Sequence, residues 1–130
     1  MVSCGVGFAQ RGAIAALDGP QDCVEAFRSA YKKRRDVAVQ VLKENGMHAY
    51  TPQGAFYILV DISASRIGSH EFAMKLLEKK HVAVAPGSTF GKLTADYVRV
   101  AFSVREEEVR EGMQRLCSFV KECEENSRHQ

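Results

Sequence analysis

A single charged residue lies in the middle of a short apolar strand near the end of this 130-residue chain. Residues 97–102 read Tyr-Val-Arg-Val-Ala-Phe, and the arginine is Arg99. Because side chains alternate between the two faces of a strand, Val98, Val100 and Phe102 share one face. Arg99 lies on the opposite face. The pattern predicts a sheet with one apolar face packed beneath helices and a guanidinium on the other.

Two interpretations of Arg99 follow from the residues alone. A guanidinium inside an apolar segment is costly unless an anion meets it. Its planar fork matches a carboxylate through two parallel hydrogen bonds. Arg99 therefore either recognises a substrate carboxylate or forms a structural ion pair with an acidic side chain such as Asp61.

The remaining apolar periodicity predicts one small domain in which helices cover strands. Apolar residues make up 45% of the chain and charged residues 26%, as in ordinary globular domains. Helical spacing covers residues 8–17, 21–45, 69–80 and the segment that follows Ser103, whereas strand patterns cover 47–50, 55–62, 82–85 and 97–102. We expect an α/β (α+β) two-layer sandwich, with a small, mostly antiparallel sheet and a long N-terminal connecting helix.

Helix starts are predicted from capping residues. Ser69 is placed to cap the helix over residues 69–80. Ser103 and Glu106 have the spacing of a capping box, which predicts that the last helix begins directly after Ser103.

Two loops are candidates for lining a site. Residues 86–91, Pro-Gly-Ser-Thr-Phe-Gly, follow a buried strand and could bring Phe90 close to a ligand. Residues 52–57, Pro-Gln-Gly-Ala-Phe-Tyr, leave room at Gly54 for a ligand or another backbone. The alternatives are a plain turn and a tight strand entry.

Charge and composition argue against several classes of function. A net charge of +2 gives no reason to expect nucleic acid, and no apolar run is long enough to cross a bilayer. The basic run over residues 32–35 predicts a solvated helix face rather than a phosphate site. The histidines and cysteines have no metal-binding or nucleophile pattern, and Cys117 falls on an apolar stripe. We expect no metal and a reduced, cytoplasmic protein, a pattern also compatible with an organelle.

Three motifs in this order resemble the class I aminotransferases, which are pyridoxal-phosphate enzymes of the aspartate aminotransferase fold. They are Pro-x-Gly-Ala-Phe-Tyr, Val-Ala-Val-Ala-Pro-Gly-Ser-Thr-Phe-Gly and Tyr-Val-Arg-Val-Ala-Phe. The segment Ala-Leu-Asp-Gly-Pro-Gln-Asp and the run Arg34-Arg35-Asp36 are also similar to this family. The resemblance covers about residues 3–120.

The resemblance implies the C-terminal part of such an enzyme. Residues 1–19 would be a remnant of the large cofactor domain, 20–46 a connecting helix, 47–123 the small domain and 124–130 a polar tail. Arg99 matches the arginine that holds the substrate's α-carboxylate, and Gly54 and Phe90 would lie near the entrance of the site.

The resemblance also implies what lies elsewhere. The family's Schiff-base lysine and its other cofactor contacts belong to sequence upstream of these motifs. We therefore expect pyridoxal 5'-phosphate in the complete enzyme, but no cofactor, no catalytic residue and no activity in this chain alone. The implied partners are an amino acid and a 2-oxo acid, the missing large domain and a second subunit. The alternative is a non-catalytic small-molecule binding or regulatory α/β module.

Overall fold

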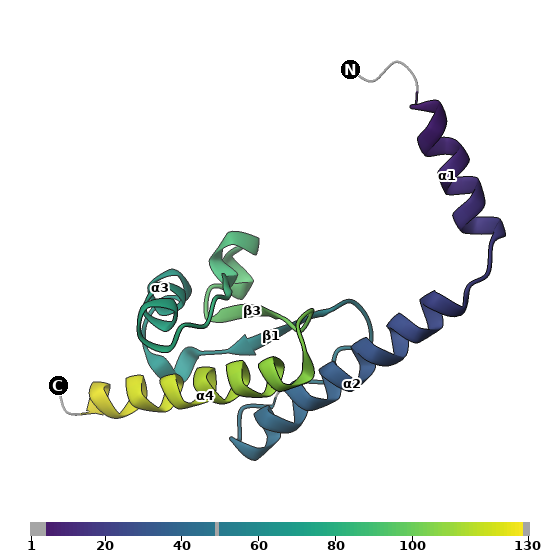
Figure 1. Ribbon diagram of the computed structural model, residues 1–130. Coiled ribbons are helices and arrows are strands. Elements are labelled where there is room, and N and C mark those ends of the chain that lie inside the picture. The colour runs from purple at the N-terminus through teal and green to yellow at the C-terminus, as the bar shows by residue number, and fades with distance from the viewer. Residues whose placement is uncertain (1–4, 49, 129–130) are drawn as a thin grey trace. The chain divides into compact units, whose positions relative to one another are not determined.

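The computed structural model describes residues 5–48 and 50–128, and these form two compact units, Met1–Ala30 and Tyr31–Gln130 (Figure 1). The first unit contains helix α1 (Gly7–Asp18) and the start of α2 (Asp22–Glu44). No residue of α1 is buried. Both helices were expected from the spacing of apolar residues, and Gly19 ends α1 as a cap whose N–H donates to the carbonyl of Ala15.

The second unit is built on a three-stranded sheet. Strands β1 (Tyr57–Asp61), β3 (Tyr97–Ala101) and β2 (Ala85–Pro86) lie in the order β1-β3-β2, and both pairs are antiparallel. In this register Arg99 on the central strand faces Leu59 on one side and Ala85 on the other. Short 3-10 turns η1 (Ser63–Ser65), η2 (Gly87–Phe90) and η3 (Lys92–Thr94) join the elements.

Helices cover one face of this sheet. Ile58, Val60 and Val98 point into the core, where they meet α3 (Ser69–Lys80), α4 (Glu106–Arg128) and the C-terminal part of α2. Figure 1 shows α4 running along the sheet. The largest fully buried helix side chains are Val41, Leu42, Phe72, Leu76, Met113, Leu116 and Cys117. The predicted α/β two-layer fold with an antiparallel sheet is confirmed.

The other face of the sheet stays outside the core. Along β1, buried side chains alternate with half-buried ones, and along β3 only Val98 is buried. Val98 is buried, whereas Tyr97 and Arg99 are half-buried. The expected placement of Arg99, opposite the face that the helices cover, is therefore confirmed.

Of the predicted strands, the one over residues 82–85 is only partly correct, and the one over 47–50 is wrong. Only Ala85 and Pro86 pair with β3, whereas Val82 and Val84 pack their side chains against the core outside the ladder. Residues 47, 48 and 50 form no strand either, and residue 49 lies outside the described residues. Instead, the hydroxyl of Tyr50 accepts a 3.0 Å hydrogen bond from the N–H of Leu59, on the edge strand β1.

Both predicted helix caps are also wrong. Gly68, not Ser69, is the N-cap of α3, and Ser69 is a buried first residue whose hydroxyl serves another segment. The last helix begins at Glu106, so Ser103 lies outside it. There the carboxylate of Glu108 accepts a hydrogen bond of 3.0 Å from the N–H of Arg105, the arrangement of a capping box two residues further along.

The chain's last segment is more regular than a polar tail. Helix α4 continues to Arg128, and the hydroxyl of Ser127 donates to the carbonyl of Cys123 at 2.9 Å. A search of the described helices for one long and apolar enough to span a membrane finds none.

Candidate functional site

Arg99 lies against two aromatic rings. Its guanidinium carbon, Cζ, is 4.3 Å from the ring centroid of Tyr57 and 4.3 Å from that of Phe90. Tyr57 begins β1, and Phe90 ends η2. Contacts of this kind stabilise a cation by about 0.5–2 kcal/mol, depending on exposure. The structure therefore brings together two of the three predicted site residues, Arg99 and Phe90.

The predicted ion pair between Arg99 and Asp61 is not formed. Within the described chain, no acidic side chain pairs with Arg99 and no acceptor takes a hydrogen bond from its guanidinium. Asp61 instead uses Oδ1 to accept the N–H of Ser63 at 2.8 Å. The half-buried guanidinium keeps its N–H groups available to an anion from outside this part of the chain.

Two further aromatic rings, those of Phe56 and Tyr31, continue the row of contacts beyond Tyr57. The ring centroid of Phe56 lies 4.2 Å from that of Tyr57 and 5.9 Å from that of Tyr31 on α2. Arg34 lies over Tyr31, with 5.2 Å from its Cζ to the ring centroid. A row of tilted ring contacts and cation–π contacts thus connects α2 with Arg99.

The loop that carries Phe90 is held by a close backbone crossing at Gly87. A Cβ built on this buried residue would lie 2.0 Å from the carbonyl oxygen of Thr94 and 2.4 Å from that of Tyr97. Only glycine fits such an approach. The hydroxyl of Thr94 closes the loop by donating to the carbonyls of Gly87 at 2.6 Å and Gly91 at 3.1 Å.

Two more hydroxyls fix the same loop. The side chain of Thr89 donates to the carbonyl of Pro86 at 2.7 Å. The N–H of Ser88 donates to the hydroxyl of Ser69 at 3.1 Å, which is the role that Ser69 takes instead of capping α3. Phe90 is consequently held in place although 49% of its surface is exposed.

Gly54, the third predicted site residue, has a different setting. It is exposed in the turn before β1, and a Cβ built on it would meet no described atom within 4 Å. The backbone strain falls on its neighbour Ala55, whose φ is 60°. No described backbone fills the space beside Gly54, and its role beside a ligand stays a prediction.

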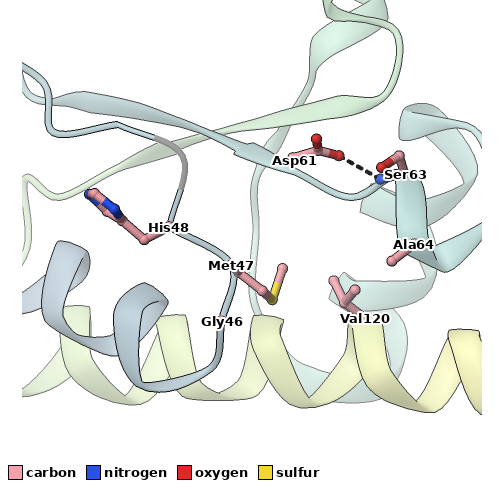
Figure 2. Close-up of a pocket in the computed structure, with 7 residues that line it drawn as sticks. All are labelled: Gly46, Met47, His48, Asp61, Ser63, Ala64 and Val120. Atoms are coloured by element: carbon pink, nitrogen blue, oxygen red, sulfur yellow. Dashed lines mark hydrogen bonds between the residues drawn. The ribbon is translucent and has the colours of Figure 1, made fainter.

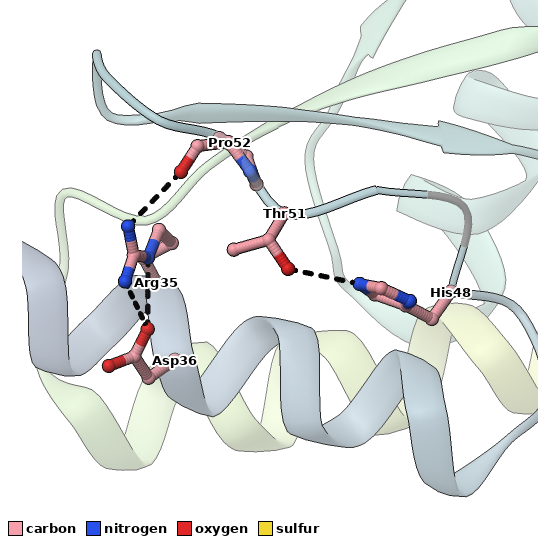
Figure 3. A network of polar contacts seen from close by, with 5 residues as sticks. All are labelled: Arg35, Asp36, His48, Thr51 and Pro52. Atoms are coloured by element: carbon pink, nitrogen blue, oxygen red, sulfur yellow. Dashed lines mark hydrogen bonds and ion pairs between the residues drawn. The ribbon is translucent and has the colours of Figure 1, made fainter.

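The turn before β1 is tied to helix α2 by Arg35 (Figure 3). Its guanidinium donates to Oδ1 of Asp36 at 2.6 and 2.9 Å and to the carbonyl of Pro52 at 3.1 Å. In the same turn, Nε2 of His48 lies 3.2 Å from the hydroxyl of Thr51. The basic run is therefore not a uniformly solvated face, because Arg35 is half-buried and structural.

A pocket of about 280 Å³ lies elsewhere in the second unit, and Figure 2 draws the residues that line it. Its described lining contains neither Arg99 nor Phe90 nor Gly54. It is lined by Gly46, Met47, His48, Asp61, Ser63, Ala64 and Val120. The side chain of Asp61 is turned toward the N–H of Ser63 there. Because the described lining includes neither Arg99 nor the rings of Tyr57 and Phe90, this pocket is separate from the candidate site.

The lysines of the chain do not fit a covalent pyridoxal-phosphate site. Two are half-buried, and each is already paired, Lys75 with Glu71 and Lys80 with Glu122, at 2.6 Å. The other six are exposed: Lys32, Lys33, Lys43, Lys79, Lys92 and Lys121. A lysine that bonds covalently to a carbonyl cofactor is activated in a desolvated pocket. None of the eight lysines is buried.

The cysteines and histidines that the structure describes add no reactive group to the site. Burial raises the pKa of the Cys117 thiol to about 11, in agreement with its predicted place in the core. Among the described residues, no three histidine, cysteine or acidic side chains form a group that could hold a metal ion. His70 and His81 are exposed, His48 is half-buried, and His129 lies outside the described residues.

The sequence pattern alone missed Tyr57 and Thr94. The contact between Tyr57 and Arg99 depends on the register of β1 against β3, which places Tyr57 opposite Ala101 and diagonal to Arg99. The sequence did carry a signal, because Tyr57 is an aromatic residue on a predicted strand, and aromatic side chains reach residues on the neighbouring strand. Thr94 carried no local signal.

The comparisons with known proteins agree on one family. Residues 2–116 match the model of the family described as aminotransferase class I and II. The aspartate aminotransferase of Sulfurisphaera tokodaii is 36% identical over 124 residues, which is 91% of this chain and 31% of that protein. The probable aspartate/prephenate aminotransferase of Aquifex aeolicus is 41% identical over 121 residues, covering 88% of this chain and 30% of that protein.

A solved aminotransferase structure shares the fold of this chain, at a sequence identity similar to that of these relatives. The aromatic aminotransferase from Pyrococcus horikoshii superposes with a TM-score of 0.84 and 36% identity, over 92% of this chain and 32% of that one. This chain belongs to the class I and II aminotransferases. It spans about 30% of the length of the curated relatives that it matches, and its fold resembles the small domain of such enzymes.

Proposed function

We propose that this chain is the C-terminal small-domain part of a pyridoxal-phosphate-dependent aminotransferase, and that Arg99 binds the α-carboxylate of the substrate. The complete enzyme would exchange an amino group between an amino acid and a 2-oxo acid. One observation carries the assignment of Arg99. Its half-buried guanidinium lies on the sheet face outside the core, and no described acidic residue neutralises it.

The chemistry of the guanidinium suits this role. Both amino acids and 2-oxo acids carry a carboxylate next to the carbon that reacts. A fork of two parallel N–H donors fixes both the position and the plane of such a carboxylate. Arg99 would therefore orient the substrate rather than take part in proton transfer, and orientation of this kind lowers the entropic cost of the reaction.

The cofactor would be held by residues outside this chain. When bound in the complete enzyme, pyridoxal phosphate supplies the electron sink for the reaction. Because no lysine here has a suitable setting, we propose that the isolated chain neither binds the cofactor covalently nor transaminates. Gly54 and Phe90 would lie at the entrance of the assembled site.

The first unit supports the proposed division into domains. Phe8 and Leu17 of α1 have 82% and 79% of their surface exposed, which is costly for apolar side chains in water. Residues 1–19 would thus belong to the large domain, 20–46 to a connecting helix and 47–123 to the small domain, whereas the polar residues 124–128 continue helix α4. A large domain and a second subunit are the proposed partners.

A cytoplasmic location is part of the same proposal. Cys23, Cys117 and Cys123 are free thiols, as expected in a reducing compartment.

The test uses the native protein that contains this sequence. It would be isolated from its own cells, its intact mass measured, and amino transfer assayed with a panel of amino acids and 2-oxo acids. The same protein with Arg99→Lys should lose about 100-fold in kcat/KM, since an ammonium cannot form the paired hydrogen bonds. An Arg110→Lys change on the exposed side of α4 is the control.

Three outcomes separate the interpretations. Transfer activity that depends on Arg99 supports the proposal. Activity that is unchanged in Arg99→Lys would contradict the assigned role. A native product of only this length that binds carboxylates without transaminating would favour the alternative, a small-molecule binding or regulatory module.

A further inference from the structure

We infer that Phe90 is a positioning residue that holds the guanidinium of Arg99 ready for the substrate carboxylate. This inference rests on the proposed function, because it specifies how that same site is kept open for an anion. The observation behind it is that the described contacts of the Arg99 guanidinium are with aromatic rings, those of Tyr57 and Phe90, rather than with acceptors.

An aromatic ring and a carboxylate hold a neighbouring guanidinium in different ways. An acidic neighbour would hold Arg99 by accepting its N–H groups, and a substrate would have to displace it. An aromatic ring attracts the cation through its π face and accepts none of those N–H groups in the plane of the fork. Arg99 is thereby restrained, while its donors stay free for a carboxylate.

Restraint matters because the arginine side chain is long. A free arginine loses rotamer entropy when it is fixed. If the rings fix the side chain before the ligand arrives, less of that cost falls on binding. The gain is a tighter complex without any new contact to the ligand.

The surroundings of Phe90 favour its contact with Arg99 over burial in the core. Tyr57 lies on a strand and contacts the ring of Phe56, so its place follows from the sheet. Phe90 lies outside the hydrophobic core cluster and has 49% of its surface exposed. Its loop is nevertheless fixed by the crossing at Gly87 and by the hydroxyl of Thr94. These features hold Phe90 on Arg99 rather than in the core.

The test compares three variants of the 130-residue chain. Phe90→Leu keeps an apolar side chain and removes the π face, whereas Phe90→Tyr keeps the ring. Leu93→Ala is the matched control, because Leu93 follows in the adjacent turn and is 95% exposed. The NMR signal of the Arg99 Nε–Hε group is recorded first without ligand and then during titration with acetate at constant ionic strength.

The ring contact should appear in the free protein. Ring currents shift the side-chain protons of Arg99, and Phe90→Leu should move them toward random-coil positions while the unfolding midpoint stays near that of the unmodified chain. Acetate binding should weaken by about 2–5-fold in Phe90→Leu, as expected for a partly exposed cation–π contact. Phe90→Tyr should restore it, and Leu93→Ala should leave it unchanged.

Two results would overturn the inference, and they differ. If Phe90→Leu binds acetate as tightly as the unmodified chain does, Phe90 has no positioning role, although Arg99 keeps its proposed function. If acetate moves the Arg99 signal in no variant and not in the unmodified chain, the proposed function fails and the inference fails with it.

Discussion

The carbonyl oxygen of Thr94 occupies the space in which a side chain at residue 87 would begin, 2.0 Å from a Cβ built on Gly87. This crossing lets the loop between β2 and β3 fold back and present Phe90 to Arg99. The geometry of the candidate site therefore depends on a backbone contact as much as on the guanidinium itself.

Replacing Gly87 should damage both stability and the site. Gly87→Ala forces the backbones of residues 87 and 94 apart, and overpacking of this kind costs about 1–3 kcal/mol or more. Urea denaturation should show the loss in the free energy of unfolding, and the ring-current shift of Arg99 should shrink. Gly112→Ala on α4 is the control, since a Cβ there meets nothing within 4 Å. It should stabilise the helix by about 0.5–1 kcal/mol. Equal effects of the two changes would contradict the role of the crossing.

Removing the hydroxyl of Tyr50 should expose the edge of the sheet. Tyr50→Phe leaves the N–H of Leu59 without its acceptor, which costs about 1 kcal/mol. Hydrogen exchange should accelerate at the amide of Leu59 more than at buried amides of β3. Tyr97→Phe is the matched change, because Tyr97 lies on the same sheet face as Leu59. It should leave hydrogen exchange at the amide of Leu59 unchanged. Unchanged exchange at Leu59 in Tyr50→Phe would show that the hydrogen bond does not form in solution.

The buried thiol of Cys117 should make stability depend on alkaline pH. Burial raises its pKa from an ordinary 9.0 to about 11, so the folded chain keeps a proton that the unfolded chain releases. Stability is full below pH 9 and falls as the pH rises from about 9 through 11, by roughly 2–3 kcal/mol in all. Cys117→Ala should flatten this dependence. Identical slopes for the two proteins would contradict a protonated, desolvated thiol.

Local patterns were sufficient to predict the fold and the face on which Arg99 lies. The alternation around Arg99 and the apolar run before Asp61 place two strands, and helical spacing places the four helices. These patterns work because burial of an apolar face is the main constraint on each element.

Contacts between distant residues were not predictable in this way. Val82 and Val84 have strong strand propensity but pack against the core instead of pairing. Ser69 has the chemistry of a cap, yet its hydroxyl accepts the N–H of Ser88, nineteen residues away. Tertiary packing overrides propensity in both places.

The candidate site likewise combines residues that local patterns predicted with contacts that depend on tertiary structure. Arg99 and Phe90 were found from motifs within single segments. The Tyr57 contact requires the register of two strands, and the Gly87 crossing requires the path of a whole loop. Neither is encoded in the spacing of neighbouring residues.

The most direct test of the account is a titration of the 130-residue chain with pyruvate, a 2-oxo acid with one carboxylate, followed at the Arg99 Nε–Hε signal. Arg99 should shift in a saturable way, chloride at equal ionic strength should not reproduce the shift, and Arg99→Gln should abolish the binding that is detected at neighbouring amides. An Arg99 signal that responds to pyruvate only as it does to chloride would contradict the claim that this guanidinium is a carboxylate-binding group.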